Sequence, residues 1–330
     1  MSKVRDKGLA GKGLKELEWA RKRMPVLAHI RKRFARQKPF KNLRIGVALH
    51  LEKKTGVLLE TLREGGAKVC AASCNPLTTD DRVAAALSRS MEVYAWEGES
   101  TKEYNWCLQK VLDSEPNIII DDGGDLIIGL HKRRGQLKKI MGACEETTTG
   151  VRRVEALEKK GRLKVPVIAV NNAHSKYLFD NRFGTGQSTV DAMIRATNML
   201  LAGKRVVVVG FGWCGRGIAE RMRGMGAKVI VVEAAGLASG TVSSYHRALE
   251  AHYSGYEVMN MKDAARAGDL FVTATGGWHA IGGEHFKLMK NGAVLANAGH
   301  FDVEIDREGL KKAAVRKRRV GPNVEEYELK

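Results

Sequence analysis

Short apolar runs rich in β-branched residues alternate along the chain with longer stretches that repeat apolar residues at helical spacing. The runs lie at 43–49, 68–73, 117–120, 165–170, 205–209, 228–232, 270–273 and 293–296. Runs this short, bounded by turn residues, predict strands, and the stretches between them predict helices. Because strands that alternate with helices are typical of parallel sheets, we expect an α/β protein with two doubly wound parallel-sheet domains.

The first residues depart from this alternation. Residues 1–13 are charged and contain glycine, which predicts a loose arm. Residues 14–37 repeat apolar positions at helical spacing, with basic residues opposite them and an interruption at Pro25. The first strand is therefore expected at 43–49.

A glycine-rich turn follows the run at 205–209. The sequence GFGWCG at 210–215 leads into a helical pattern that continues through Met225, and the next apolar run ends in Glu233. A strand, a glycine turn, a helix and a second strand with a terminal acid, about 20 residues past the glycines, are typical of a Rossmann dinucleotide-binding domain. The turn would hold a pyrophosphate at the helix N-terminus. Its candidate residues are Gly210, Gly212, Trp213, Cys214 and Gly215.

Glu233 makes NAD the expected dinucleotide. A carboxylate at this position accepts hydrogen bonds from the ribose hydroxyls of NAD, whereas NADP sites use an arginine for the 2′-phosphate. The sequence has no arginine close to Glu233. The residues that follow, 234–240, are small and flexible, so they could place other groups there.

Polar residues also stand at the ends of the four runs in the first half of the chain. In chain order they are His50, Cys74-Asn75, Asp121-Asp122 and Asn171-Asn172. In an open parallel sheet the ligand crevice lies beyond the carboxyl ends of the strands, so these side chains are expected to converge on a site of their own. Taken singly, each has an ordinary alternative: the histidine could be a satisfied buried side chain and the aspartates part of a turn. The segment EETTTG at 145–150 likewise suits either a helix cap or a hydroxyl-rich ligand.

The domain boundary is expected between residues 180 and 181. This gives a substrate-binding and catalytic domain at 1–180 and an NAD-binding Rossmann domain at 181–330. Residues 179–185 form an apolar, glycine-containing bridge, and Ser188 begins a capping-box-like start for a helix through Leu201. The last two strands lead to TGG at 275–277 and NAGH at 297–300, which puts a histidine beside the expected nicotinamide crevice.

Composition narrows the function classes. The 330 residues include 56 Lys+Arg and 37 Asp+Glu, a net charge of +19, but the basic clusters lie on separate predicted helices and lack interleaved aromatic residues. We therefore expect a solvated basic surface with weak nonspecific polyanion binding and no specific nucleic-acid site. The five cysteines form no CxxC pair and no zinc spacing, which predicts no metal and a reducing cytoplasm. No apolar stretch approaches the roughly 20 residues of a membrane span, and the N-terminus is too polar for a signal peptide.

Five motifs, in order, resemble those of one family. They are DDGGDL at 121–126, EETTTGV at 145–151, SKxxFDNxxGxxxS from Ser175, GFGWCGRG at 210–217 and AGHFDVEID at 298–306. The chain resembles adenosylhomocysteinase (S-adenosylhomocysteine hydrolase) from about Gly13 to its last residue. The segments SCNPLTTDD from Ser73 and YAWEGES from Tyr94 also fit.

The resemblance implies tightly bound NAD and reversible cleavage of S-adenosylhomocysteine to adenosine and homocysteine, a reaction of the methyl cycle. It also implies two domains that close over the substrate and a homo-oligomer, usually a tetramer. The chemistry explains why such a hydrolase needs a redox cofactor. Oxidation of the ribose 3′-hydroxyl to a ketone acidifies the C4′ hydrogen, so homocysteine can leave by β-elimination. Water then adds, the ketone is reduced again, and NAD is regenerated in each turnover.

By the same resemblance, Lys176 and Asp180 manage the 3′-hydroxyl proton and C4′ abstraction, and Glu146 holds ribose hydroxyls. His50 and Asp122 match the acid-base pair at the 5′ side. The residues expected around NAD are Thr147, Thr148, Thr149, Asn181, Glu233, Thr275, Ala298, Gly299 and His300.

The chain departs from the family pattern in the expected base pocket. Glu52 and Lys54 stand where many members carry Thr and Glu, and Asp80 stands where Gln is usual. An ammonium group can only donate, which suits the carbonyl oxygen of hypoxanthine, so S-inosylhomocysteine is an alternative substrate. In the other interpretation Lys54 simply points to solvent.

Two further departures concern the NAD site. The segment between Glu233 and Arg247 is longer than usual in the family and lacks its Asp-Pro. The sequence also ends at Lys330, before the family's segment that completes the NAD site and carries a Gly-His-Pro loop, which predicts weak NAD retention.

Two other functions are compatible with the motifs. An ordinary NAD dehydrogenase could act on a hydroxy acid with His300 as the acid-base group, and NADH would then accumulate in solution. A truncated NAD- or nucleoside-binding protein without turnover would bind adenosine but neither hydrolyse nor form the thioether.

Overall fold

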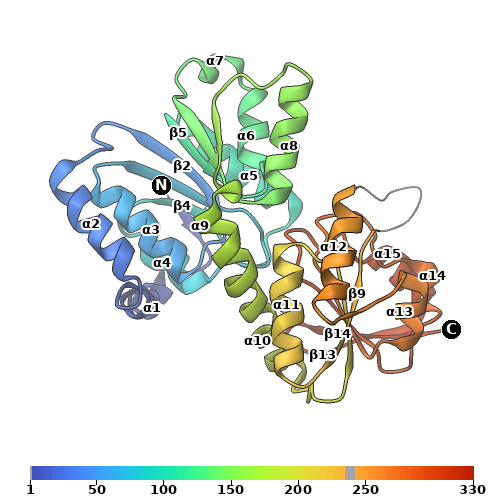
Figure 1. Ribbon diagram of the computed structural model, residues 1–330. Helices are drawn as coiled ribbons and strands as arrows, with labels where there is room; N and C mark the ends of the chain where they lie inside the picture. The colour runs from blue at the N-terminus through green and yellow to red at the C-terminus, as the bar shows by residue number, and fades with distance from the viewer. Residues whose placement is uncertain (1, 235–241) are drawn as a thin grey trace. The chain divides into compact units, whose positions relative to one another are not determined.

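The computed structural model describes residues 2–234 and 242–330, and the chain forms two compact units, Met1–Asn172 and Ala173–Lys330 (Figure 1). Each unit contains one parallel sheet with helices on its two faces. The α/β class with two doubly wound domains is therefore confirmed. The first unit ends at Asn172, earlier in the chain than the predicted domain boundary. The boundary between residues 180 and 181 stays a prediction.

The first unit has seven parallel strands in the order β1-β4-β3-β2-β5-β6-β7. The strands are β1 Lys3–Val4, β2 Arg44–Leu49, β3 Lys68–Ser73, β4 Glu92–Ala95, β5 Ile118–Asp121, β6 Gly142–Glu145 and β7 Val167–Ala169. The helices are η1 Lys7–Leu9, α1 Ala10–Arg21, α2 Pro25–Gln37, α3 Lys53–Glu64, α4 Asp81–Leu87, α5 Thr101–Asp113, α6 Asp125–His131, α7 Arg134–Leu137, α8 Thr148–Lys159 and η2 Val170–Asn172.

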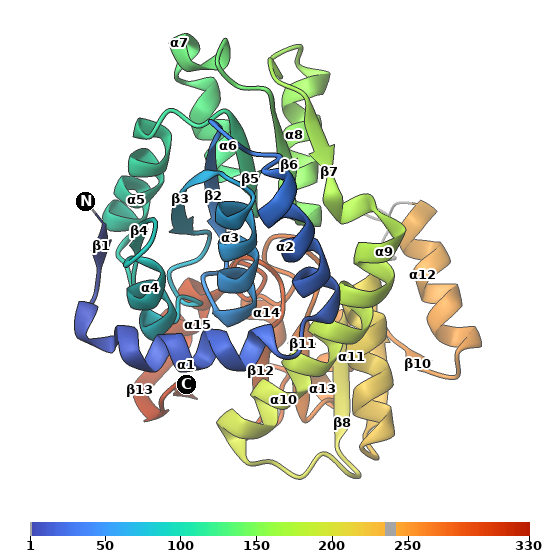
Figure 2. The same cartoon turned by 90° about the vertical axis from the view of Figure 1, so that its left-hand side faces the viewer.

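The two-residue period of the strands explains why helices cover both faces of this sheet. In β2, Ile45, Val47 and Leu49 pack in one core cluster with α1, α3 and α4, whereas Ala48 packs in another with α5, α6 and α8. Figure 2 shows α3 and α5 beside the strands that they cover. A strand buried on both faces is held in a fixed register, so the residue after each strand has a fixed position at the carboxyl edge of the sheet.

The prediction of a loose arm at residues 1–13 is wrong. Lys3 and Val4 pair in parallel with Tyr94 and Ala95 of β4, and α1 begins at Ala10. The pairing satisfies backbone groups of a segment too short to give a sequence signal of its own. Strands β4 and β6 were also not predicted, because each includes a glutamate and at most one β-branched residue.

The second unit has five parallel strands in the order β10-β9-β8-β11-β12. The strands are β8 Arg205–Val209, β9 Lys228–Val232, β10 Glu257–Val258, β11 Leu270–Thr273 and β12 Val294–Asn297, with the antiparallel pair β13 Ala314–Gly321 and β14 Val324–Leu329. The helices are α9 His174–Lys176, the π-helix η3 Tyr177–Thr185, α10 Gly186–Thr197, α11 Trp213–Gly224, α12 Val242–Tyr253, α13 Met261–Ala267, α14 Gly283–Phe286 and α15 Arg307–Ala313. Helices α10, α11 and α12 pack in one core cluster with the sheet, and α13, α14 and α15 in the other.

The predicted helix start at Ser188 is wrong. The segment 179–185, expected as a bridge, is helical, and α10 continues directly from it, so no cap is needed at Ser188. The Ser188 hydroxyl instead donates to the Thr185 carbonyl oxygen one turn earlier. Helix α10 ends at Thr197, before the expected Leu201, because Asn198 takes a left-handed conformation (φ 52°).

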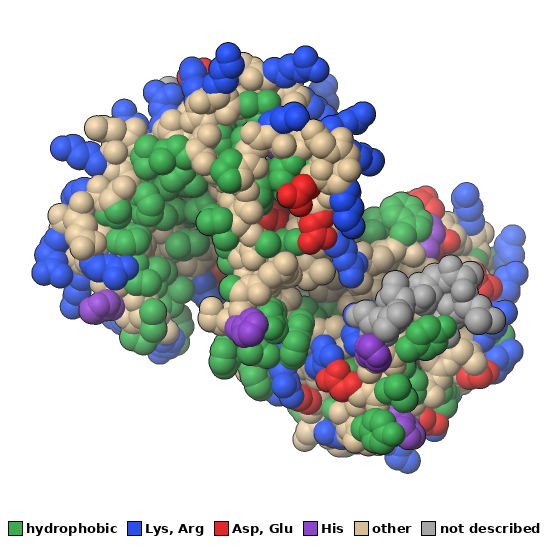
Figure 3. All heavy atoms as spheres, turned by 45° about the horizontal axis from the view of Figure 1, so that its top comes forward, with side chains coloured by type: hydrophobic (Ala, Val, Ile, Leu, Met, Phe, Trp, Pro, Cys, Tyr) green, Lys and Arg blue, Asp and Glu red, His purple; other side chains and the backbone are tan. Residues whose placement is uncertain are grey.

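The basic cluster at 316–319 lies on a strand, not on a helix as predicted. In the β13–β14 pair Arg316 lies opposite Glu328 and Arg318 opposite Glu326, so acidic side chains oppose the basic ones. Lys and Arg side chains are scattered over the face in Figure 3 and do not form one stripe there. Among the residues described, no helix has the length and apolar character needed to cross a lipid bilayer.

Candidate active site

The order of the first sheet reverses between β2 and β5, and the residues after these strands meet. His50 follows β2, and its Nε2 lies 3.5 Å from Asp122 Oδ2, just beyond β5. The His50 Nδ1 and the Thr78 hydroxyl oxygen are 2.7 Å apart. The Asp122 side chain is 5% exposed and that of His50 38%, so an accessible imidazole rests on a buried carboxylate. Ligands of doubly wound proteins bind at such a switch point, and this pair has the groups for acid-base catalysis.

Cys74 joins this pair from the end of β3. Ligand atoms of His50, Cys74 and Asp122 lie within 4.8 Å of one another. Burial, and then the charges of Asp122 and Asp121, raise the pKa of the Cys74 thiol well above its usual range, so the thiol stays protonated. The donor set is one that zinc accepts, but the absence of a metal stays a prediction. Sequence reasoning put Cys74 at a strand end and missed it as a site residue.

Two fully buried carboxylates shape the loops of the site. Asp121 accepts from the backbone N–H groups of Asp122 and Ile127, and Glu145 Oε1 accepts from Gly123 N and Thr147 N, each at 2.9 Å. Burial, and then the charge of Glu145, raise the pKa of Asp121 well above normal, and burial raises the pKa of Glu145. Both carboxylates thus fix the backbone on which Asp122 and the threonines stand. The sequence has no signal that separates them from the adjacent acids Asp122 and Glu146.

The segment at 145–150 leads into α8, in agreement with its interpretation as a helix cap. Thr147 is the N-cap, and its hydroxyl accepts from Gly150 N at 3.2 Å. Thr148 donates to Asn171 Oδ1 at 3.3 Å, which joins the end of β6 to that of β7. Glu146 and Thr149 lie partly exposed beside them. The predicted roles of Glu146 and of the three threonines toward ribose and NAD stay predictions.

In the second unit the three glycines of the turn have three different surroundings. Gly210 has φ 98°, and a Cβ there would lie 2.8 Å from the Ala274 carbonyl oxygen. A Cβ on Gly215 would lie 1.8 Å from the Gly210 carbonyl oxygen, whereas a Cβ on Gly212 would meet no described atom within 4 Å. Protein packing therefore explains the first and third glycines but not Gly212. Open space at the middle glycine, at the N-cap of α11, fits the approach of a pyrophosphate.

Glu233 directly follows β9, as predicted, and its carboxylate accepts from Phe211 N of the turn at 2.5 Å. The statement that no arginine is near Glu233 is wrong in space, because Arg247 Nε of α12 donates to it at 2.9 Å. The contact joins residues 14 positions apart, so no local sequence pattern could reveal it. Of the residues expected to be flexible, 234–240, all but Ala234 lie outside the described part of the chain.

Lys176, Asp180 and Asn181 lie beside the glycine turn, on α9 and η3. Lys176 Nζ is 3.6 Å from Asp180 Oδ2, and the lysine side chain is only 11% exposed. Asn181 Nδ2 donates to Cys214 Sγ at 3.4 Å, and its buried Oδ1 accepts no hydrogen bond from a described residue. The Tyr177 ring lies 4.8 Å from that of Trp213. The structure thus brings the predicted proton-transfer pair to the dinucleotide turn, with a buried acceptor that a ligand could satisfy.

Two loops after β11 and β12 complete this edge of the second sheet. Glu304, 1% exposed, accepts from the backbone N–H and hydroxyl of Thr275 and from Gly276 N. Asn297 Nδ2 donates to the Gly299 and Phe301 carbonyl oxygens, which shapes the loop of Ala298, Gly299 and His300. Glu304, a residue of the AGHFDVEID motif, therefore holds the loop of Thr275 and Gly276 in place. It was not predicted as a site residue.

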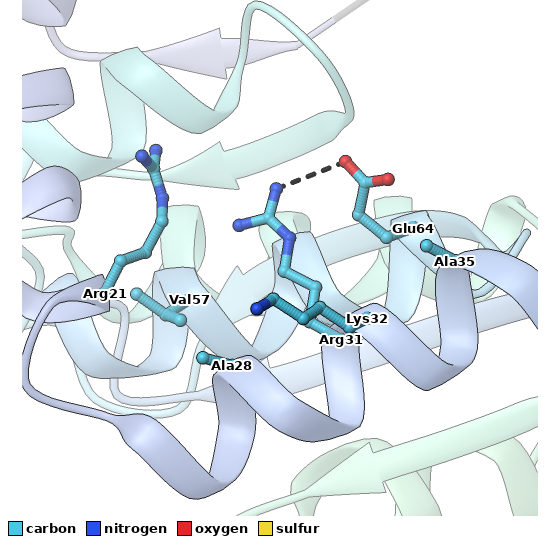
Figure 4. A pocket seen from close by; sticks show the side chains of 7 residues that line it. All are labelled: Arg21, Ala28, Arg31, Lys32, Ala35, Val57 and Glu64. Carbon is cyan, nitrogen blue, oxygen red and sulfur yellow. Dashed lines mark hydrogen bonds and ion pairs between the residues drawn. The ribbon is translucent and has the colours of Figure 1, made fainter.

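The hollow drawn in Figure 4 lies elsewhere, between α2 and α3. Its volume is about 330 Å³, and its lining includes Arg21, Arg31 and Glu64. The guanidinium groups of Arg21 and Arg31 bind Glu60, and Arg31 also binds Glu64. The charges of both arginines are thus balanced by glutamates of α3. We therefore do not assign the active site to this hollow.

With these sites described, comparison with known proteins identifies the family. Residues 181–330 match the model of the S-adenosyl-L-homocysteine hydrolase NAD-binding domain, and residues 1–136 match the S-adenosyl-L-homocysteine hydrolase model. The S-inosyl-L-homocysteine hydrolase of Methanococcus maripaludis is 54% identical over 100% of this chain and 78% of its own length. The adenosylhomocysteinase of Pyrococcus abyssi is 56% identical over 99% of this chain and 76% of its own length.

One solved structure, a dipicolinate synthase from Bacillus halodurans, shares the fold. It has a TM-score of 0.51 and 13% identity, covering 83% of this chain and 88% of its own. That likeness concerns the fold alone. The two family models and the relatives, together with the glycine turn and Glu233, lead to one conclusion: the chain belongs to the S-adenosyl-L-homocysteine hydrolase family and is an NAD-dependent enzyme of that type.

Proposed function

We propose that the protein reversibly hydrolyses S-adenosyl-L-homocysteine, or its inosine counterpart, to the nucleoside and L-homocysteine. The observation that supports the proposal is the presence of two close pairs of ionisable side chains, one in each unit. His50 is paired with the buried Asp122, and Lys176 with Asp180 beside the dinucleotide turn. A simple hydrolase needs one such pair, whereas oxidation, elimination and hydration of one sugar need proton transfer at two positions.

When bound, NAD would accept a hydride from the 3′-carbon and later return it. Lys176 and Asp180 receive the proton of the 3′-hydroxyl and remove the C4′ hydrogen that the ketone acidifies. His50 donates a proton to the departing thiol and accepts one from the entering water, while Asp122 holds the imidazole and stabilises its charged form. Glu146 accepts hydrogen bonds from ribose hydroxyls. The hydride removed in the oxidation is returned in the final reduction, so the cycle needs no outside oxidant, and the protons taken up by these side chains are released again before the turnover ends.

The proposal is tested by thioether synthesis from nucleoside and homocysteine with NAD added, and by exchange of the C4′ hydrogen in deuterated water. We expect synthesis and exchange to require NAD and to produce no net NADH. Net accumulation of NADH would instead favour an ordinary dehydrogenase. Nucleoside binding without synthesis or exchange would contradict catalysis altogether.

The predicted base pocket favours inosine as the nucleoside. Glu52 is the N-cap of α3 and accepts from Lys54 N and Thr55 N, and Asp80 caps α4 and binds Arg82. The carboxylates that could accept from an adenine amino group are thus already engaged. The exposed Lys54 ammonium makes no hydrogen bond or ion pair with a described residue, so it can donate to the carbonyl oxygen of hypoxanthine.

This second candidate predicts a preference for the inosyl thioether that a single substitution of Lys54 should weaken. We expect kcat/KM for S-inosylhomocysteine to exceed that for S-adenosylhomocysteine, and Lys54→Glu to reduce the ratio by about tenfold or more. Lys53→Glu is a suitable control, because the Lys53 ammonium is bound by Glu16. A preference for the adenosyl thioether that Lys54→Glu leaves unchanged would show that Lys54 only faces solvent.

We also propose that the protein is a homo-oligomer. Light scattering should give the mass of a tetramer.

A further inference from the structure

The carboxylate at the end of β9 and an arginine of α12 form a bidentate pair. Arg247 Nε donates to Glu233 Oε1 at 2.9 Å, and Arg247 Nη2 lies 3.5 Å from Glu233 Oε2. The Glu233 side chain is 4% exposed and that of Arg247 27%. A buried anion and a partly buried guanidinium therefore share the position at which Rossmann domains bind the adenosine ribose of a dinucleotide.

Glu233 is also tied to the glycine turn, through its contact with Phe211 N on Oε1. Oε1 thus accepts two short hydrogen bonds, one from the turn and one from Arg247. With the described residues, Oε2 makes longer contacts, with Ala234 N at 3.3 Å and Arg247 Nη2 at 3.5 Å. The two short bonds fix the orientation of the carboxylate, and Oε2 is the oxygen with capacity for the ribose hydroxyls.

We infer that Arg247 is a specificity-determining residue for the dinucleotide and that Glu233 controls which one it favours. With the Glu233 carboxylate in place, Arg247 orients it for the ribose diol and its own charge is balanced by this partner, so NAD is selected. Without that carboxylate, the same guanidinium is a phosphate-binding group and selects NADP. The inference rests on the NAD-binding assignment of the second unit and not on thioether hydrolysis.

Electrostatics give the direction of the preference. In the native site a 2′-phosphate would lie against the Glu233 carboxylate in a buried position, where like charges are poorly screened. Guanidinium groups bind phosphate oxygens through paired N–H donors, so Arg247 has the geometry to hold the phosphate once the competing carboxylate is gone. Both outcomes use the same arginine, and the identity of residue 233 decides between them.

The test measures binding of the adenosine half of the cofactor, by calorimetric titration with ADP-ribose and with 2′-phospho-ADP-ribose. The wild-type protein should prefer ADP-ribose by at least about tenfold, or about 1.4 kcal/mol. Glu233→Gln should reverse the preference, and Glu233→Gln combined with Arg247→Gln should lose the gained affinity for the phosphorylated ligand. Arg247→Gln alone should weaken ADP-ribose binding, because the carboxylate loses an orienting partner.

Glu250→Gln is the matched control, because Glu250 lies on the same helix and binds Arg216. It should keep the wild-type preference. The inference is overturned if Glu233→Gln still prefers ADP-ribose, if the double variant keeps the gain, or if Arg247→Gln binds ADP-ribose as the wild type does. Binding of neither ligand by any of these proteins also overturns it. Failure of thioether hydrolysis leaves these titrations unaffected, so the two hypotheses fail separately.

Discussion

At the scale of single residues, the His50 imidazole lies between a hydroxyl and a carboxylate that differ in burial. Thr78 is exposed, whereas Asp122 is nearly inaccessible, so the contact that becomes an ion pair when the imidazole is protonated lies on the buried side. A buried carboxylate stabilises a charged imidazole more strongly than a solvated hydroxyl can. The pair is therefore suited to take up and release a proton during the elimination and hydration steps.

We expect Asp122→Asn to slow thioether cleavage by about 10²–10⁴-fold while 3′-oxidation continues. The asparagine keeps the shape of the side chain but cannot stabilise a charged His50. Single-turnover absorbance of reduced nicotinamide would follow oxidation, and thiol release would follow cleavage. Thr78→Val, which removes the other partner of the imidazole, should have a smaller effect. Equal loss of oxidation and cleavage in Asp122→Asn would mean that this carboxylate maintains the fold and not proton transfer.

A second residue-scale prediction concerns the buried Asp121. Its pKa is raised by burial and by Glu145, so the native state holds a proton at pH values where the unfolded chain, with an ordinary pKa of about 4, has lost it. The resulting stability is present at low pH and is lost as pH rises through the raised native pKa.

Asp121→Asn is neutral throughout and should flatten this fall in the melting temperature of the first unit. Scans of thermal unfolding from about pH 4 upward would measure the slope. Glu155→Gln, on the exposed surface of α8, should keep the wild-type slope. An unchanged slope in Asp121→Asn would contradict the assignment.

At the scale of elements, the strands with strong apolar patterns were predictable and those without such a pattern were not. The predicted bounds of β8, β9 and β11 agree with the structure, because each is a continuous β-branched or apolar run buried on both faces. Strand β1 has two residues and depends on pairing with β4, which no local pattern can reveal. For the same reason, the sequence could predict which residues lie at the site but not which side chains bind each other there. Arg247 reaches Glu233 through the packing of α12, and Glu304 reaches Thr275 through a loop.

The glycine turn gives an element-scale prediction, because Gly212 and Gly215 should fail in different ways. Gly215→Ala would force a Cβ to within 1.8 Å of the Gly210 carbonyl oxygen, so it should destabilise the second unit by about 1–3 kcal/mol. Gly212→Ala meets open space and should change stability by less than about 0.5 kcal/mol. Its effect should instead appear as weaker ADP-ribose binding in calorimetry. Unaltered ADP-ribose binding by Gly212→Ala would mean that the pyrophosphate does not approach this glycine.

At the scale of the whole molecule, the charge excess and the cores have different consequences. The net charge of +19 remains after every acidic residue is counted against a basic one, and opposed pairs such as those of β13 and β14 show that part of the positive charge is balanced locally. The hydrophobic clusters divide cleanly, with two in Met1–Asn172 and two in Ala173–Lys330. Each unit therefore has the core that an independently cooperative domain requires.

We expect calorimetric unfolding to resolve two transitions, with NAD raising only one of them. A ligand that binds one native unit stabilises it by about 2.7 kcal/mol at a hundred times its Kd, and the other unit gains only what interdomain coupling transmits. The variants assign the transitions: Gly215→Ala should lower the NAD-sensitive transition, and Asp121→Asn should alter the pH dependence of the other. A single transition, or equal shifts of both with NAD, would mean that the units unfold as one cooperative body despite their separate cores.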